Sequence, residues 1–299
     1  MTEQWGKLAI SVAGALVIAA PAFAQQDNLD ISAELMASAV AANGKAADGD
    51  EDSDRTGGVA GGSLGFNYDK DADHLNLDLS STYFEYVDEA RIDRWSNDIS
   101  GTYGRDFTSD LRLSGIASYT SQSLLLESAS ANQSQLRARL AYSPGPHRIR
   151  ATGGWRWRDY RDLADGEGEG PTITVDYRYR LGGGRYVSVS ARYEEIDSNI
   201  DRADHRRDTF TAEYGHRFGQ NTDAVFALQW RDWTYPYRTV RGAPREDWRI
   251  APSFFITHDF GDGWTGEFEG LAIYRDSNSA GREQTITRVT LTMRKRFDL

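Results

Sequence analysis

The chain has 299 residues, a formal net charge of −11 and no cysteine. The absence of cysteine excludes a disulfide framework, and the acidic balance argues against a nucleic-acid partner. Hydrophobic residues make up only 39% of the chain, yet it contains 12 Phe, 8 Trp and 15 Tyr. The fold therefore has to explain why a chain with so few hydrophobic residues contains so many aromatic rings.

The first 24 residues have the three parts of a secretory signal. Lys7 precedes an apolar run over residues 8–20, and Ala22, Phe23 and Ala24 form a small-x-small cleavage site. That run is shorter than the roughly 20 apolar residues of a transmembrane helix, and no later run approaches this length. The sequence predicts a secretory signal peptide over 1–24 and one exported domain over 25–299.

From residue 28 onward, apolar and polar residues alternate in segments that we interpret as β-strands, because successive side chains of a strand point to opposite faces. In one segment Ile173, Val175 and Tyr177 share a face, while Thr174 and Asp176 lie on the other. Residues 28–40 are also compatible with a short helix. The predicted strands are 28–40, 59–69, 74–86, 94–105, 111–121, 132–142, 148–158, 171–181, 186–195, 208–218, 224–233, 248–260, 264–275 and 284–299.

The connections between these segments are alternately short and long. The short ones are 70–73, 106–110, 143–147, 182–185, 219–223 and 261–263, and the long ones include 41–58, 159–170, 196–207 and 234–247. This asymmetry is typical of a closed antiparallel transmembrane β-barrel with short periplasmic turns and longer extracellular loops. We therefore predict an all-β barrel of about 14 strands. The strands of a soluble two-sheet sandwich also alternate between apolar and polar residues, so this periodicity alone does not exclude a sandwich.

Aromatic residues on the apolar face fall into two belts, which a membrane barrel requires and a sandwich does not. Those predicted near the long connections are Tyr83, Trp95, Tyr119, Trp155, Trp157, Trp230 and Trp248. Those predicted near the short turns are Tyr68, Tyr103, Tyr142, Phe218, Phe260, Trp264 and Phe297.

The last eleven residues read VTLTMRKRFDL, with Phe297 two positions before the terminal Leu299. This alternating ending resembles the final strand that the barrel-assembly machinery recognises in the Gram-negative outer-membrane β-barrel class. Within that class the chain is similar to fourteen-stranded monomeric porins, without a motif that fixes one family. The resemblance implies location in the cell outer membrane, contact with membrane lipid and lipopolysaccharide, assembly by that machinery, and no cofactor.

Most arginines within the strands lie on the polar face, which would face the interior of a barrel. The predicted pore-lining basic residues are Arg112, Arg137, Arg139, Arg148, Arg150, Arg156, Arg158, Arg178, Arg180, Arg192, Arg217, Arg231 and Arg249. The predicted pore-lining acids are Asp30, Glu34, Asp78, Asp98, Asp176, Glu213, Glu267 and Glu269. Basic and acidic walls on opposite sides would select solutes by charge. Alternatively, the same residues form a salt-bridge lattice that stiffens the wall.

Other motifs carry less information. The string Gly61-Gly62-Ser63-Leu64-Gly65 matches G-x-S-x-G, but it continues a strand where a nucleophile needs a strand-to-helix turn. Alternate aspartates at 48, 50 and 52 begin like a calcium loop but lack its glycine and its glutamate. His205 is expected at a loop surface, and His216 and His258 on the outward face. We predict no metal site and no catalytic residues.

These observations predict a porin-like channel for polar or charged small solutes, and not an enzyme. Residues 159–170 and 234–247 are candidate constriction loops, and charge reversal at Arg156 and Arg178 is expected to shift ion selectivity. An export pore for an acidic polysaccharide or a surface lipoprotein is the alternative. An outer-membrane hydrolase is a third candidate. The permeant solute is not indicated.

Overall fold

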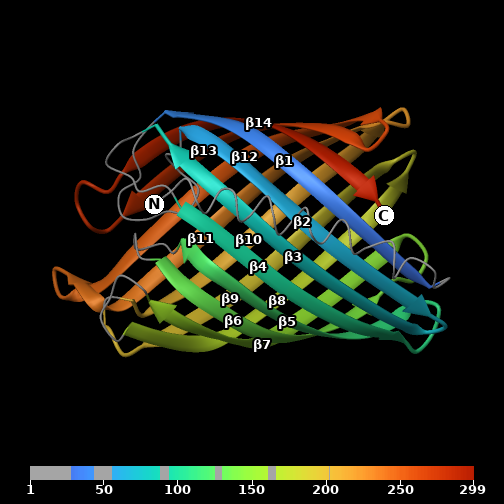
Figure 1. Cartoon of the computed structure of the whole chain (residues 1–299). Coiled ribbons are helices and arrows are strands. Elements are labelled where there is room, and N and C mark those ends of the chain that lie inside the picture. Colours follow the sequence, from blue (N-terminus) through green and yellow to red (C-terminus); the bar gives the residue numbers. More distant parts are fainter. Residues whose placement is uncertain (1–27, 44–55, 88–93, 125–129, 161–165, 202) are drawn as a thin grey trace, which may run out of the picture.

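A computed structural model describes residues 28–43, 56–87, 94–124, 130–160, 166–201 and 203–299, and these residues form a closed antiparallel barrel (Figure 1). Its strands are β1 Leu29–Asn43, β2 Gly57–Lys70, β3 Asp73–Tyr86, β4 Arg94–Asp106, β5 Leu111–Leu124, β6 Ser130–Tyr142, β7 His147–Tyr160, β8 Gly166–Gly182, β9 Arg185–Ser198, β10 His205–Phe218, β11 Thr222–Val240, β12 Ala243–Gly261, β13 Trp264–Ser277 and β14 Gln284–Asp298. Each strand pairs with its neighbours in sequence, so the predicted fold class and the predicted 14 strands are confirmed. The signal sequence and the aspartates at 48, 50 and 52 lie outside the described residues.

The barrel closes between its first and last strands. Pairing of β1 with β14 runs from Ser32 opposite Asp298 to Asn43 opposite Thr287. Side chains reinforce the seam, since the hydroxyl oxygens of Ser38 and Thr292 lie 2.8 Å apart. The helical alternative for residues 28–40 is therefore wrong. Closure pairs the backbone groups that two free edges would expose, which a wall surrounded by lipid requires.

The barrel wall has an apolar outward face and a polar inward face. Strands of 13 to 19 residues exceed the roughly 9–11 that cross a bilayer, so their ends project beyond it. Outward side chains are largely exposed, including Leu136, Val189 and Phe226 at 59%, 54% and 55%. Such a continuous apolar surface is a lipid-facing band. Among the described residues, no helix is long and apolar enough to cross a membrane.

The predicted loop over 234–247 is wrong. Strand β11 continues to Val240 and β12 starts at Ala243, so these residues form a long hairpin that projects at the left of Figure 1. Pro236 lies past the end of β10, where β11 pairs only with β12, and proline is tolerated on such an edge. In the predicted loop 159–170, Asp159 and Tyr160 belong to β7 and residues 166–170 to β8.

The turn of this hairpin contains a strained residue. Arg241 and Gly242 have φ angles of 51° and 85°, a conformation that suits glycine and disfavours residues with a Cβ. We expect Arg241→Gly to raise the free energy of unfolding by about 1 kcal/mol. Urea unfolding of the protein in detergent would measure it. Thr239→Gly, in the strand before the turn, should lower the stability instead, by about 0.5–1 kcal/mol.

Candidate functional site

Six inward arginines on β6, β7 and β8 form a patch that we call the arginine wall: Arg137, Arg139, Arg148, Arg150, Arg178 and Arg180. In the described part of these three strands, Asp176 is the only acid on the inward face. Arg148 lies directly opposite Arg178, which places like charges side by side. The wall therefore concentrates positive charge on one side of the barrel interior.

These guanidinium groups have few partners within the protein. Arg178 lies 4.0 Å from the carboxylate of Glu213 and stacks on the ring of Tyr186 at 4.0 Å. Arg139 donates a long hydrogen bond of 3.4 Å to the hydroxyl of Thr152. Within the described ranges, no carboxylate oxygen lies within 4.0 Å of the other five arginines of the wall. Charges without protein partners need water or a bound anion.

The opposite side of the barrel is different, because its acids are neutralised. Strand β14 lies across the barrel from β7 and carries Arg288, Arg294 and Arg296 on its inward face. Arg294 lies 2.8 Å from Glu34 and 3.1 Å from Glu267. The remaining pairs are Arg288 with Glu269 at 3.2 Å and Arg296 with Asp30 at 4.0 Å. We call this set the acid–arginine seam.

Part of the predicted acidic wall is therefore neutralised. Asp30, Glu34, Glu267 and Glu269 pair with arginines of β14, whereas no described cationic group lies within 4.0 Å of the other two acids of that wall, Asp78 and Asp98. The three arginines of β14 are not among the predicted pore-lining residues. Their positions alternate with Val289, Leu291 and Met293, which is the signal that would have placed them inside.

A second group of arginines surrounds the buried Glu194 near the long connections. The Glu194 carboxylate accepts from Arg156, from Arg192 at 2.6 Å and from Arg207 at 2.6 Å. Both Glu194 and Arg156 are 1% exposed. Arg158, one inward position further along β7, donates to Gln133 at 2.8 Å. For these residues the salt-bridge alternative describes the structure, and Arg156 is not a free charge in the bore.

A third group surrounds Asp247, which is fully buried. Its carboxylate accepts from Arg245 at 2.5 Å, from Arg275 at 2.7 Å and from Ser277 at 2.5 Å. The indole of buried Trp233 lies beside it, with the guanidinium carbons of Arg231, Arg249 and Arg275 each 5.6 Å from the ring. Cation–π contacts of this kind add to the stability of the group.

The connection after β9 reaches over the inner face of the barrel. Buried Ala203 contacts Tyr160 and Ala131, which are inward residues of β7 and β6, and Ile200 packs against them. His205 is also buried, so its predicted surface position is wrong, and its Nδ1 lies 2.9 Å from the carbonyl of Ala203. Tyr160 belongs to the predicted constriction loop 159–170, and Tyr235, Arg245 and Asp247 of the predicted loop 234–247 are buried as well.

The other predicted lumen residues also face inward. At the short-turn end, Arg112 and Arg217 pair with Asp106 at 2.6 Å and Asp223 at 2.9 Å. Asp98 accepts from Thr120 at 2.5 Å, and Asp78 lies opposite Gly65 and Ser100. That these residues line a working pore stays a prediction.

The residues of the predicted aromatic belts lie on the outward face. Near the long connections, Tyr83 contacts Trp95 with ring centroids 5.1 Å apart, and Trp248 contacts Tyr274 at 5.5 Å. Tyr119, Trp155, Trp157 and Trp230 are exposed at the same end. Toward the short turns lie Tyr68, Tyr103, Tyr142, Phe218, Phe260, Trp264 and Phe297. Their roles at membrane interfaces stay predictions.

Gly154 makes room for the arginine wall. A Cβ at this inward position of β7 would lie 2.2 Å from the carbonyl oxygen of Leu136 and 2.6 Å from Cγ of Arg137. We expect Gly154→Ala to lower the free energy of unfolding by about 1–3 kcal/mol through overpacking. Gly153→Ala is the matched control, because nothing lies within 4 Å of its Cβ. Equal urea midpoints for the two variants would contradict the packing argument.

The alternative motifs do not form a catalytic set. Gly61 to Gly65 lie within strand β2. His216 and His258 face outward against Phe218 and Phe260, whereas Ser253 and Asp259 face inward. The barrel wall therefore separates the histidines from both potential partners. No group of metal-binding side chains occurs among the described residues. That the protein is not an enzyme stays a prediction.

No protein-family model matches the sequence, and no curated protein sequence matches it significantly. Solved structures match in fold. A bacterial polysaccharide outer membrane secretin has a TM-score of 0.55 at 12% identity and covers 89% of this chain and 98% of its own. OmpT of Vibrio cholerae has a TM-score of 0.52 at 11% identity, covering 91% and 99%. The outer membrane channel DcaP of Acinetobacter baumannii has 0.51 at 12%, covering 90% and 96%.

These matches define the class of protein. The chain has the fold of an outer-membrane β-barrel, and the predicted class is confirmed. The predicted location in the cell outer membrane agrees with this fold and with the lipid-facing band. At 11–12% identity the likeness extends to the fold alone.

Proposed function

We propose that this barrel is a porin-like channel that passes small polar solutes and favours anions over cations. The arginine wall is the observation that carries the proposal, because five of its six guanidinium groups have no carboxylate within 4.0 Å among the described residues. A fixed positive surface beside water raises the local concentration of anions. DcaP of Acinetobacter baumannii is an outer membrane channel with a similar fold, which supports the same function for this chain.

Planar-bilayer recording tests this proposal. Purified protein should produce stable conductance steps, and in a KCl gradient the reversal potential should have the sign of a chloride-selective pore. Unheated protein should migrate faster than boiled protein in gels, which checks that the barrel is folded. A silent bilayer with folded protein, or a potassium-selective reversal potential, would refute the proposal.

Export of an acidic polysaccharide is a second candidate. The same arginine wall would attract the negative charges of a passing polyanion. The polysaccharide secretin has a similar fold. Blocking of the current by long polyuronate chains, with repeated passage events, would favour this candidate over the channel for small solutes. We also propose that membrane lipid and lipopolysaccharide cover the outward band, and that the barrel-assembly machinery inserts the chain.

A further inference from the structure

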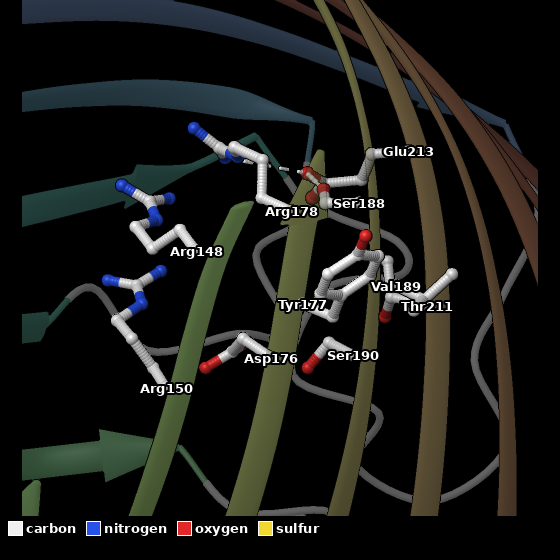
Figure 2. Close-up of a pocket in the computed structure, with 10 residues that line it drawn as sticks. All are labelled: Arg148, Arg150, Asp176, Tyr177, Arg178, Ser188, Val189, Ser190, Thr211 and Glu213. Carbon is white, nitrogen blue, oxygen red and sulfur yellow. Dashed lines mark hydrogen bonds and ion pairs between the residues drawn. The ribbon is translucent and has the colours of Figure 1, made fainter. Parts of the chain in front are cut away.

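Two rows of inward side chains begin in the arginine wall and cross β7, β8, β9 and β10 (Figure 2). In order across the strands, one row contains Arg148, Arg178, Ser188 and Glu213, and the other contains Arg150, Asp176, Ser190 and Thr211. Neighbouring strands lie about 4.8 Å apart and the rows about 6.7 Å apart, so the side chains form a compact grid. They line a pocket of about 120 Å³.

The two sides of the grid differ in the hydrogen-bonding groups that they offer. Its β7 side offers the guanidinium groups of Arg148 and Arg150, which donate only. Its β9 and β10 side offers the hydroxyls of Ser190 and Thr211, which donate and accept, and Asp176 between them accepts only. Glu213 accepts from Ser188 at 2.7 Å.

Much of this hydrogen-bonding capacity is unused by the protein. In the described ranges, neither hydroxyl has a hydrogen-bond partner, and no cationic group lies within 4.0 Å of the Asp176 carboxylate. Arg150 is the neighbour of Asp176 in register but does not pair with it. The pocket therefore presents free donors for an anionic group next to free partners for hydroxyl groups.

We propose that this pocket binds a sugar that carries an anionic group, either a carboxylate or a phosphate; the inference rests on the channel function proposed above. Guanidinium groups bind both anions through charge-assisted hydrogen bonds. The hydroxyls and Asp176 then bind the sugar hydroxyls. A simple anion leaves the β9 and β10 side unused, and a neutral sugar leaves the arginines without a counter-charge.

Calorimetric titration of the full-length protein in detergent tests the ligand class. Glucuronate should bind about tenfold more tightly than acetate, and glucose 6-phosphate about tenfold more tightly than inorganic phosphate, since each sugar adds hydrogen bonds. Whichever of the two acidic sugars binds more tightly identifies the preferred anionic group. Glucose should not bind measurably. Equal affinities of each acidic sugar and its simple anion would overturn the proposal.

Two variants separate the two halves of the pocket. Ser190→Ala combined with Thr211→Val should weaken glucuronate binding about tenfold and leave acetate binding unchanged. Arg148→Gln should weaken both by at least about tenfold. Thr82→Val, on the inward face of β3, is the control for the hydroxyl changes. Unchanged glucuronate affinity in the folded double variant would overturn the assignment of the site.

The outcome is independent of the channel experiment, because binding is measured without a membrane. A silent bilayer together with tight glucuronate binding would refute the channel and leave the site in place. Anion-selective conductance together with equal binding of glucuronate and acetate would refute the site and leave the channel in place.

Discussion

Replacing Glu194 with glutamine is expected to lower the free energy of unfolding by about 3–5 kcal/mol. Glu194 is 1% exposed, and its carboxylate is the shared counter-charge of Arg156, Arg192 and Arg207. Glutamine keeps the shape of the side chain but removes the negative charge, so buried guanidinium groups lose their compensation. Urea unfolding in detergent, followed by the shift from the fast to the slow gel band, measures the loss.

Glu213→Gln is the matched control for this experiment. Glu213 is also inward-facing, but its contact with Arg178 is 4.0 Å and both side chains are about one-third exposed, at 34% and 30%. Solvent screens such a pair, so the expected loss is below about 1 kcal/mol. Similar urea midpoints for the two variants would show that Glu194 is not a critical counter-charge.

The second large effect is expected on ion selectivity. Replacing both Arg148 and Arg150 with glutamate should lower the chloride-to-potassium permeability ratio about tenfold at low salt. The change inverts two charges of the arginine wall that no described carboxylate within 4.0 Å compensates. The reversal potential in a KCl gradient measures it. The effect should shrink in 1 M salt, where the Debye length is about 3 Å.

An outward double variant controls for overall charge. Arg105→Glu with Arg185→Glu makes the same change in net charge, but both residues lie on the outward face near the short turns. This variant should keep the selectivity of the unmodified protein. If both double variants shift the reversal potential equally, the inner wall does not set selectivity.

Arg156 is not a suitable position for changing selectivity. The sequence predicts that Arg156 and Arg178 both control it, but Arg156 is buried against Glu194. Reversing its charge would place two carboxylates together in a buried group and would unfold the wall locally. Arg178 remains a suitable position, although its stacking on Tyr186 makes it less informative than Arg148 and Arg150.

For residues 234–247, the local sequence pattern predicts the wrong structure. Pro236 and Pro244 and the polar residues around them favour a loop, yet the segment is a hairpin with an irregular register between Tyr235 and Thr239. Buried Trp233 and Tyr235 anchor the start of that hairpin inside the barrel. The residues that pack against Trp233 and Tyr235 lie on β10, β12 and β13, so no short stretch of the sequence contains all of these partners.

The alternation of side chains in a strand is a local property, so the sequence was enough to predict a two-faced wall, its number of strands and the inward direction of most lumen arginines. Which of these arginines are neutralised became known from the folded barrel. Arg156 finds its carboxylate 38 positions away and Arg294 finds one 260 positions away. The arginine wall has no such partner within 4.0 Å among the described residues, apart from the 4.0 Å contact of Arg178. Charge compensation depends on neighbours that closure of the barrel brings together, and periodicity carries no information about them.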